Sequence, residues 1–153
     1  MILDSGERTK FDSGAVRDIK EGKGRCDLMP LDVVTKLLND DIIIVYIYEF
    51  LQEGKIGYLF ECLAHFEKQY YTSMEEMLLE VSVHFEEGAL KYGEWNWQKG
   101  IPQKSYIDSA IRHYLKVRRG DQDEDHARAF VWNIMCLIWT AKHINKDNKM
   151  EGK

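Results

Sequence analysis

Hydrophobic residues recur at helical spacing from Pro30 onward. Leu31, Val34, Leu37 and Leu38 lie three, three and one residues apart, which places them on one face of a helix that begins near Pro30. Proline suits the first turn of a helix, because its missing N–H is not needed there. The pattern therefore predicts the first of several helices.

The next hydrophobic segment, residues 42–52, is ambiguous in its local pattern. Its first seven residues are isoleucine, valine and tyrosine, a composition that alone is typical of a β-strand. Asp40 or Asp41 can cap a helix at its start, and Glu49–Gln52 extend the segment. Because the neighbouring segments also show helical patterns, we predict a helix here.

Four further helices are indicated by apolar periodicity and by start and stop signals. Ser73 and Glu76 form an S-x-x-E capping box, and Gly120 follows the end of a later helix. The predicted helices cover residues 58–69, 73–90, about 105–119 and about 125–145, and residues 92–104 form a loop. These patterns predict an all-α protein, a helical bundle of about five to six helices.

The chain divides into three parts by composition. Residues 1–28 are polar, contain four glycines and show no sustained apolar period, so we expect an irregular N-terminal arm. Residues 29–145 are expected to form a single helical domain. Residues 146–153 are polar, and we expect a flexible tail.

Length and charge limit the class of protein. A chain of 153 residues can build one domain with a hydrophobic core. The net charge of -5 argues against a stable nucleic-acid complex, and no apolar run approaches the roughly 18 residues needed to cross a membrane. The three cysteines, Cys26, Cys62 and Cys136, are odd in number and scattered, which fits reduced thiols in the cytoplasm.

One predicted helix carries a face with metal-binding chemistry. Glu80, His84, Glu87 and Lys91 are spaced by four, three and four residues, so they share one side of the helix. Two carboxylates and an imidazole suit a divalent cation, and a lysine can bind phosphate. The alternative is a solvated face with ordinary ion pairs.

A second candidate is the acidic segment before the last helix, which holds Asp121, Asp123, Glu124 and Asp125. A helix N-terminus favours one or two acids through capping and its dipole. The surplus acids repel one another unless a cation binds, and oxygen ligands favour Mg²⁺ or Mn²⁺. The alternative is a merely acidic helix start.

Asp108 and Arg112 are four residues apart, the spacing of a structural ion pair, although Arg112 could instead hold a phosphate and His113 lies beside it. In the loop before them, Trp97 could stack on a base and Asn96 could read a base edge. The alternative for the indole is a structural role in the core.

The glycine-containing arm carries basic residues. They are Arg17, Lys20, Lys23 and Arg25, and as a mobile arm this segment could close over an anionic ligand, although plain solubility is the alternative.

Taken together, these stretches resemble a known phage and prophage family, the dATP/dGTP diphosphohydrolase N-terminal family, a relative of the MazG-type all-α nucleotide pyrophosphohydrolases. The resemblance covers most of residues 17–140. It is carried by Arg17-Asp18, Gly22–Pro30, His84–Ala89, Lys91–Gly93, Asn96-Trp97, Lys99-Gly100, Tyr106, Asp108–Ala110, Arg112-His113 and Ala129–Asn133.

The resemblance implies a helical hairpin core, a homodimer or homotetramer, and Mg²⁺-dependent (or Mn²⁺-dependent) cleavage of a purine (d)NTP to a nucleoside monophosphate and pyrophosphate. For such an enzyme we predict catalytic roles for Glu87, Lys91, Arg112 and His113, nucleotide binding by Lys23, Arg25, Tyr92, Asn96, Trp97 and Asn133, and metal binding by Glu80, His84, Glu87, Asp108, Glu124 and Asp125. The setting would be the cytoplasm of a bacterial host, with the protein encoded by a phage or prophage.

One departure from the pattern keeps a second hypothesis open. MazG-type enzymes hold metal through E-x-x-E on one helix and E-x-x-D on the next. Here the nearest forms are His84-x-x-Glu87 and Asp121-x-x-Glu124, and Ala127 stands where an acid would complete the second motif. The alternative is therefore a non-catalytic phage protein that sequesters a nucleotide second messenger of host defence. A third hypothesis, a helical oligomerisation module without a ligand site, would explain the apolar core positions but not the clustered charged residues.

Overall fold

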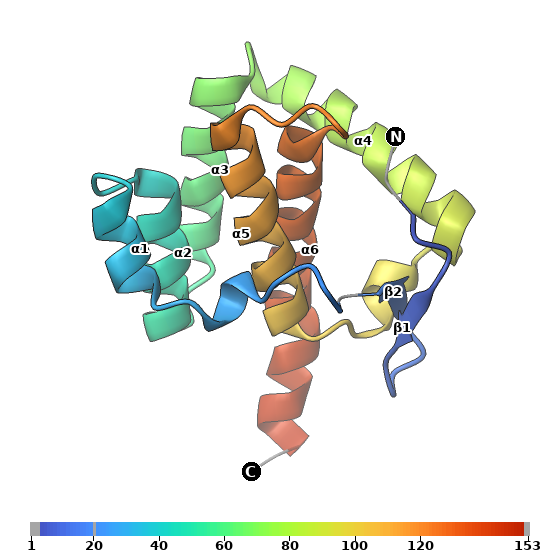
Figure 1. The fold of residues 1–153 in the computed structure, drawn as a ribbon. Helices are drawn as coiled ribbons and strands as arrows, with labels where there is room; N and C mark the ends of the chain where they lie inside the picture. Colours follow the sequence, from blue (N-terminus) through green and yellow to red (C-terminus); the bar gives the residue numbers. More distant parts are fainter. Residues whose placement is uncertain (1–3, 20, 152–153) are drawn as a thin grey trace.

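Two long helices, α5 (Gln103–Arg119) and α6 (His126–Glu151), pack side by side through the centre of the molecule (Figure 1). The structure is a computed structural model that describes residues 4–19 and 21–151, with side chains described as far as residue 144. Most of the buried side chains of α5 and α6 meet along this pair, where Tyr114 lies 5.5 Å from the ring of Phe130.

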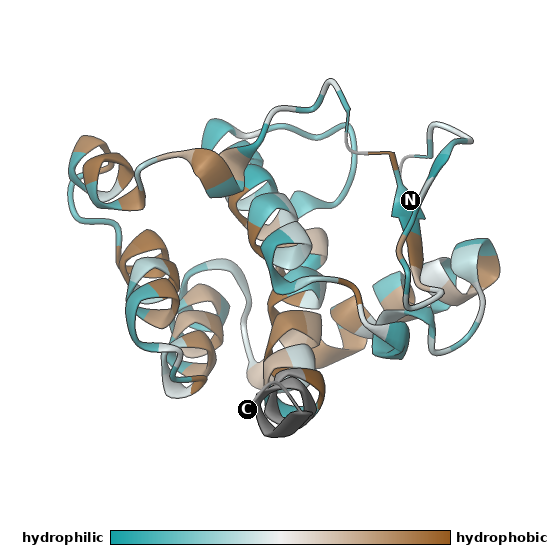
Figure 2. Cartoon of the chain, turned by 90° about the horizontal axis from the view of Figure 1, so that it is seen from below, coloured by the Kyte–Doolittle hydropathy of each residue, from teal (hydrophilic) through white to brown (hydrophobic). Residues whose placement is uncertain are grey.

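Three shorter helices cover one flank of this pair. They are α1 (Leu31–Leu37), α2 (Ile42–Glu53) and α3 (Gly57–Tyr70), with α2 packed on α3 and α3 packed on α6 (Figure 1). Phe66 of α3 joins the flank to the centre, because its ring lies 4.4 Å from that of Phe130 and 6.1 Å from that of Tyr114. In Figure 2, hydrophobic and hydrophilic residues alternate around the helices, as in amphipathic helices that share a core.

The isoleucine-rich segment is a helix, as predicted. The Asp41 side chain accepts hydrogen bonds from the backbone N–H groups of Ile43 and Ile44 and so caps α2. Ile43, Ile47 and two more apolar residues of α2 are fully buried or nearly so. Burial of this face outweighs the modest preference of β-branched residues for strands.

Helix α4 (Met74–Tyr92) crosses one end of the bundle and contacts α6 (Figure 1). The predicted capping box is present in a shifted form: Ser73 accepts a hydrogen bond from the Glu76 N–H, while the Glu76 carboxylate accepts from Thr72. The chain then forms a short 3₁₀ turn, η2 (Asn96–Lys99), before α5 begins. The predicted loop at 92–104 thus contains one helical turn.

The N-terminal arm is more ordered than its composition indicated. Strands β1 (Arg8–Lys10) and β2 (Val16–Asp18) form an antiparallel hairpin, followed by a 3₁₀ turn, η1 (Cys26–Leu28). Three-residue strands are too short to show a period-two pattern in the sequence. Their pairing depends on contacts with distant loops, described below, which local patterns cannot reveal.

Within the described part of the chain there are six α-helices and one small sheet, so the all-α fold class is confirmed. The predicted tail at 146–153 overlaps the end of α6, whose backbone is helical to Glu151, and its last two residues lie outside the described residues. None of the helices described is both long and apolar enough to span a bilayer.

Candidate functional site

A cavity of about 800 Å³ lies where the hairpin meets α4, α5 and α6. It gathers residues from segments that are far apart in the sequence, including several of the residues predicted to be catalytic or to bind nucleotide or metal. Those in its wall are Lys23, His84, Tyr92, Asn96, Arg112, His113, Glu124 and Asn133. The prediction that the arm, the α4 face and the α5 face belong to one site is consistent with this arrangement.

Cations outnumber anions in the wall of this cavity. Arg17, Lys23, Arg112, Lys116 and Arg119 line it. Its carboxylates are those of Asp4, Asp18 and Glu124. A positively charged, partly enclosed cavity attracts polyanionic ligands such as a phosphate chain, and the low local dielectric strengthens that attraction.

Arg17 reaches into the cavity from β2 and is held in place by aromatic rings. Its guanidinium carbon lies 5.4 Å from the centre of the Tyr106 ring and 5.6 Å from that of Trp132. Its Nη2 donates to the Asn133 side-chain oxygen at 3.2 Å, whereas its buried Nη1 has no hydrogen-bond partner among the described residues. Burial lowers the Arg17 pKa, yet an arginine stays protonated. A buried donor without a partner indicates a place for an acceptor.

His84 lines the same cavity from α4. Its ring packs 5.4 Å from Trp132, and its buried Nδ1 has no hydrogen-bond partner in the described structure. Burial, with Arg128 and Arg17 nearby, lowers the pKa of His84 to about 3, so the imidazole is neutral at pH 7. A neutral imidazole in this position offers either a donor or an acceptor to a bound ligand.

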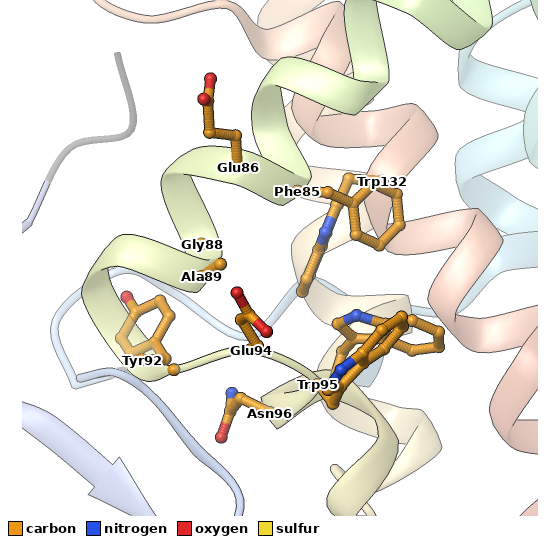
Figure 3. A pocket seen from close by; sticks show the side chains of 11 residues that line it. Phe85, Glu86, Gly88, Ala89, Tyr92, Glu94, Trp95, Asn96 and Trp132 are labelled. Carbon is orange, nitrogen blue, oxygen red and sulfur yellow. The ribbon is translucent and has the colours of Figure 1, made fainter.

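A second, mainly apolar pocket of about 440 Å³ adjoins the cavity (Figure 3). Its aromatic wall consists of Phe85, Tyr92, Trp95, Trp97 and Trp132. Gly88, Tyr92, Asn96 and Trp132 line both spaces, so the two are neighbours with a common wall.

Trp95 is unusual in two respects. It is 61% exposed, and its φ of +65° is in the left-handed region that large side chains seldom adopt. Its ring lies 6.0 Å from that of Trp97. An exposed indole held in a strained conformation beside a pocket is typical of a ligand-binding position rather than of a core position.

A cluster of histidines and acids lies at the wall of the larger cavity, between α5 and the start of α6. The Nδ1 atoms of His113 and His126 are 2.9 Å apart, and Asp123 lies 2.6 Å from the other ring nitrogen of His126. A Glu124 carboxylate oxygen lies within 4.8 Å of a ring nitrogen of each histidine. Burial raises the Glu124 pKa, and burial together with His126 lowers the His113 pKa well below its usual value.

Several residues predicted to hold metal are engaged in structural contacts instead. Asp108 is 1% exposed, and its carboxylate accepts from the Cys26 N–H and from Arg112, both at 2.6 Å. Arg112 also donates to the carbonyl groups of Lys23 and Gly24. This pair fastens the segment after the hairpin to α5, so the structural alternative applies to Asp108, while Arg112 still lines the cavity.

Three more of the predicted residues lie outside the cavity wall. Glu87 pairs with Arg128 of α6 at 3.2 Å, and the Asp125 side chain accepts from the Arg128 N–H at 2.9 Å, which caps α6. Glu80 is exposed on α4. Residues 80–91 lie on one continuous helix, α4, as predicted, but α6 contacts part of that helix through the pair between Arg128 and Glu87.

Two predicted nucleotide contacts are also structural. The Asn96 side chain accepts from the Val16 N–H at 2.9 Å and donates to the Val16 carbonyl at 2.7 Å, so its amide is satisfied by β2. Asn133 donates to the Ala129 carbonyl and accepts from Arg17. Both residues position cavity-lining groups rather than face a base.

Lys91 and Arg25 are not among the residues that line the cavity. Lys91 lies 4.0 Å from Asp4, which is itself in the wall, and Arg25 pairs with Asp27 at 2.7 Å. The predicted direct role in binding stays a prediction for both.

Sequence reasoning named Arg17 only as one basic residue of the arm and His126 only as the end of the acidic segment, and it gave neither a role of its own in the site. Arg17 was visible as one of several basic residues in the arm, but nothing local distinguished it from its neighbours. His126 ends the acidic segment, and an imidazole beside surplus carboxylates is the signal that could have identified it.

The six residues predicted to bind Mg²⁺ do not converge on one point in this chain. In the described structure, three potential ligand atoms lie within 4.8 Å of one another in two places, at His113, Glu124 and His126 and at Asp121, Asp123 and His126. Of these residues, Glu124 alone was predicted to bind metal. The donor set that does converge contains imidazole nitrogens, which Mg²⁺ seldom uses. The predicted Mg²⁺ set therefore does not fit the arrangement.

Comparison with known proteins gives one match. The family described as dATP/dGTP diphosphohydrolase, N-terminal, matches residues 64–150, which run from α3 into α6 and include the α4 and α5 walls of the site. No curated protein and no solved structure matches the chain significantly. The matched segment is more than half of the 153 residues. The chain thus belongs to the dATP/dGTP diphosphohydrolase N-terminal family.

Proposed function

We propose that this protein binds a purine nucleoside triphosphate across the two adjoining spaces and cleaves it to a nucleoside monophosphate and pyrophosphate. The observation that carries the proposal is the wall shared by the aromatic pocket and the cation-lined cavity. A nucleotide has the same division into a flat, apolar base and a polyanionic chain. The family description, which names dATP and dGTP, supports the choice of substrate.

The aromatic pocket would hold the base. Trp95 and Trp97 offer indole faces for stacking, which contributes about 1–3 kcal/mol per base. Glu86 and Glu94 also line the pocket, and the Glu94 carboxylate, which points among the labelled side chains in Figure 3, can accept hydrogen bonds from base N–H groups. Acidic acceptors beside stacked rings favour a base with exposed donors.

The cavity would hold the triphosphate. Arg17 presents an unpartnered buried N–H, and Lys23 and Lys116 in the same wall add positive charge. During hydrolysis a water oxygen bonds to the α-phosphorus, the bond to the bridging oxygen breaks, and the water gives up a proton. Fixed cations stabilise the charge that develops on the departing pyrophosphate. A divalent cation, when bound, would add further electrostatic stabilisation.

The direct test measures pyrophosphate release from dATP, dGTP, dCTP and dTTP, with Mg²⁺ or Mn²⁺ present. We expect one pyrophosphate per monophosphate, with purines preferred. Inorganic phosphate without pyrophosphate would indicate a different cleavage position. Absence of turnover for every nucleotide with both metals would contradict the enzymatic part of the proposal.

A second candidate function is binding without catalysis. It is favoured by the engagement of Glu87, Asp108 and Asp125 in ion pairs and caps, which leaves these acids in structural roles. Such a protein would sequester a nucleotide, for example a second messenger of host defence. It predicts tight binding that survives EDTA and no change in the recovered ligand. Loss of binding on chelation would count against it.

We also propose the biological setting that the resemblance implies: a phage or prophage protein, related to the MazG-type enzymes, that acts in the cytoplasm of the bacterial host as a homodimer or homotetramer. Size-exclusion chromatography with light scattering tests the subunit number. A monomer at micromolar concentration would contradict that part of the proposal.

A further inference from the structure

We propose that His113, Glu124 and His126 form a binding site for one transition-metal dication at the wall of the cation-lined cavity, with Asp123 as a positioning residue. The class of metal is the borderline group that includes Fe²⁺, Co²⁺ and Zn²⁺, not Mg²⁺. The inference rests on the proposed function only in assigning the triphosphate as the molecule beside the metal.

The distances between donor atoms suit a single ion. The two Nδ1 atoms lie 2.9 Å apart. Two imidazole nitrogens that each bind one ion at about 2.1 Å, at roughly a right angle, are about 3.0 Å apart. A Glu124 oxygen lies within 4.8 Å of a nitrogen of each histidine, a separation that three ligands of one metal can span.

The orientation of His126 also fits a ligand. Asp123 lies 2.6 Å from Nε2 of His126, and this contact holds a proton on Nε2. With its proton on Nε2, His126 uses Nδ1 as the acceptor of the 2.9 Å hydrogen bond from Nδ1 of His113, and a bound metal would take the place of the proton between the two nitrogens. A carboxylate on the second ring nitrogen of a metal-binding histidine fixes the ring and raises its basicity.

A second group of potential ligands shares His126 but is less suitable. It combines Asp121, Asp123 and His126 on the outer side of the imidazole. Asp121 is already bound by Arg119, whose Nε donates to it at 2.7 Å. Neither Asp121 nor Asp123 lines the cavity, whereas His113 and Glu124 both do. We therefore assign the metal to the inner group.

Ligand type selects the metal. Two imidazoles and one carboxylate are the set found at zinc and non-haem iron sites, which leave further coordination positions open. Mg²⁺ prefers carboxylates, water and phosphate oxygens in octahedral geometry. The open positions here would face the cavity.

Another residue of the cavity wall offers an independent sign of a ligand. The Arg17 guanidinium is buried, and its Nη1 has no partner in the described residues. Arg17 and the inner group line the same cavity. A phosphate chain placed between them would satisfy both the orphan donor and the open metal positions.

The test is titration of the purified full-length protein with Co²⁺ alone, followed by its visible d–d absorption. We expect one Co²⁺ per chain and at least a tenfold loss of affinity in His113→Asn and in Glu124→Gln. Asp123→Asn should lower the Co²⁺ affinity by about 10-fold to 100-fold, the usual effect of removing a residue that hydrogen-bonds to a metal ligand. Zn²⁺ should displace the cobalt, and millimolar Mg²⁺ should not.

Two matched variants serve as controls. Asp121→Asn removes the acid of the outer group, and Glu80→Gln removes an exposed acid of α4. Both should bind Co²⁺ like the unaltered protein. Equal affinity in His113→Asn, or loss in Asp121→Asn without loss in Glu124→Gln, would overturn the proposal. Circular dichroism melting checks that each variant is folded, and His126→Asn is avoided because His126 is only 2% exposed.

The result separates this site from the proposed function. Pyrophosphate release with Mg²⁺ by a protein that binds no Co²⁺ would overturn the metal site and leave the function standing. Stoichiometric Co²⁺ binding by a protein that turns over no nucleotide would do the reverse.

Discussion

The side chain of Asn96 binds both backbone polar groups of Val16, with distances of 2.9 Å and 2.7 Å. The two residues are 80 positions apart in the chain. This pair fixes strand β2 to the turn after α4, and Arg17, the next residue of β2, is thereby aimed into the cavity. The hairpin is thus a wall of the site.

The first prediction follows from this pair. Asn96→Ala removes two hydrogen bonds and leaves the Val16 backbone groups without their partner, at a cost of about 1–3 kcal/mol in the free energy of unfolding. Nucleotide affinity should also fall, because Arg17 loses its anchor. Urea unfolding and calorimetric titration measure the two effects. Gln122→Ala, on an exposed loop, is the control. Unchanged nucleotide affinity in Asn96→Ala would mean that the position of the hairpin does not contribute to binding.

A second prediction concerns the charge of Arg17. Arg17→Met keeps an unbranched side chain between Tyr106 and Trp132 but removes the guanidinium. A hydrogen bond to a charged group contributes about 1.5–3 kcal/mol, so triphosphate affinity should fall about 10-fold to 150-fold. Stability should change little, because an apolar side chain replaces a desolvated charge.

The comparison for Arg17 is Lys36→Met. Lys36 is exposed, pairs with Asp40 and is not part of the cavity wall. We expect no more than a twofold change in affinity for that variant. Equal losses in both variants would mean that overall charge, rather than the aimed guanidinium, attracts the ligand, and salt dependence would then be equally steep in both.

The third prediction tests the aromatic pocket. Trp95→Ala removes an indole that is 61% exposed, so the free energy of unfolding should stay within about 0.5 kcal/mol. Affinity for dGTP should fall by about 1–3 kcal/mol, the contribution of one stacked base. Inorganic tripolyphosphate, which has no base, should bind the variant and the unaltered protein equally. A parallel loss for tripolyphosphate would place Trp95 at the phosphates instead.

The fourth prediction is a dependence of stability on pH. Burial holds the His84 pKa at about 3 in the folded chain, against about 6.5 for unfolded histidine. Between these values the unfolded chain binds a proton that the folded chain does not. Stability is therefore present above about pH 6.5 and declines as the pH falls, by about 1.4 kcal/mol per pH unit for each such histidine. His113 acts in the same direction.

Urea unfolding at pH 7.5 and pH 5.5 measures this decline. His84→Gln should make the difference between the two pH values smaller, because glutamine does not titrate. His65→Gln, on a side chain 39% exposed, is the matched control for replacing a histidine by glutamine. An equal decline in His84→Gln would mean that other groups cause it.

The sequence predicted the helices because their signals are local. The Ser73 cap and the apolar period of α5 depend on residues within a few turns, and both are present. The Ile42 segment shows that a cap and a buried face can override a strand-like composition. The fold class therefore needed no long-range information.

The candidate site was predictable only in part, for a physical reason. The helix faces indicated by the sequence supply several residues of the cavity wall, but local spacing does not show which carboxylate a neighbouring helix will use. Glu87 is bound by Arg128, 41 positions away, and Asp108 caps the Cys26 N–H, 82 positions away. Arg17 enters the cavity only because a short hairpin docks on a distant turn.

The last prediction distinguishes Glu124 from Asp125, two adjacent acids that were both predicted from the sequence to bind metal. Asp125 accepts from the Arg128 N–H and caps α6, so Asp125→Ala should lower the free energy of unfolding by about 1 kcal/mol and leave Co²⁺ affinity unchanged. Glu124 faces the cavity beside His113, so Glu124→Gln should reduce Co²⁺ affinity with little effect on stability. Urea unfolding and Co²⁺ titration of both variants give four values. Because the residues are neighbours of the same charge, opposite patterns cannot arise from net charge and must reflect the direction of each side chain. The reverse pattern would exchange the two assignments and remove Glu124 from the metal site.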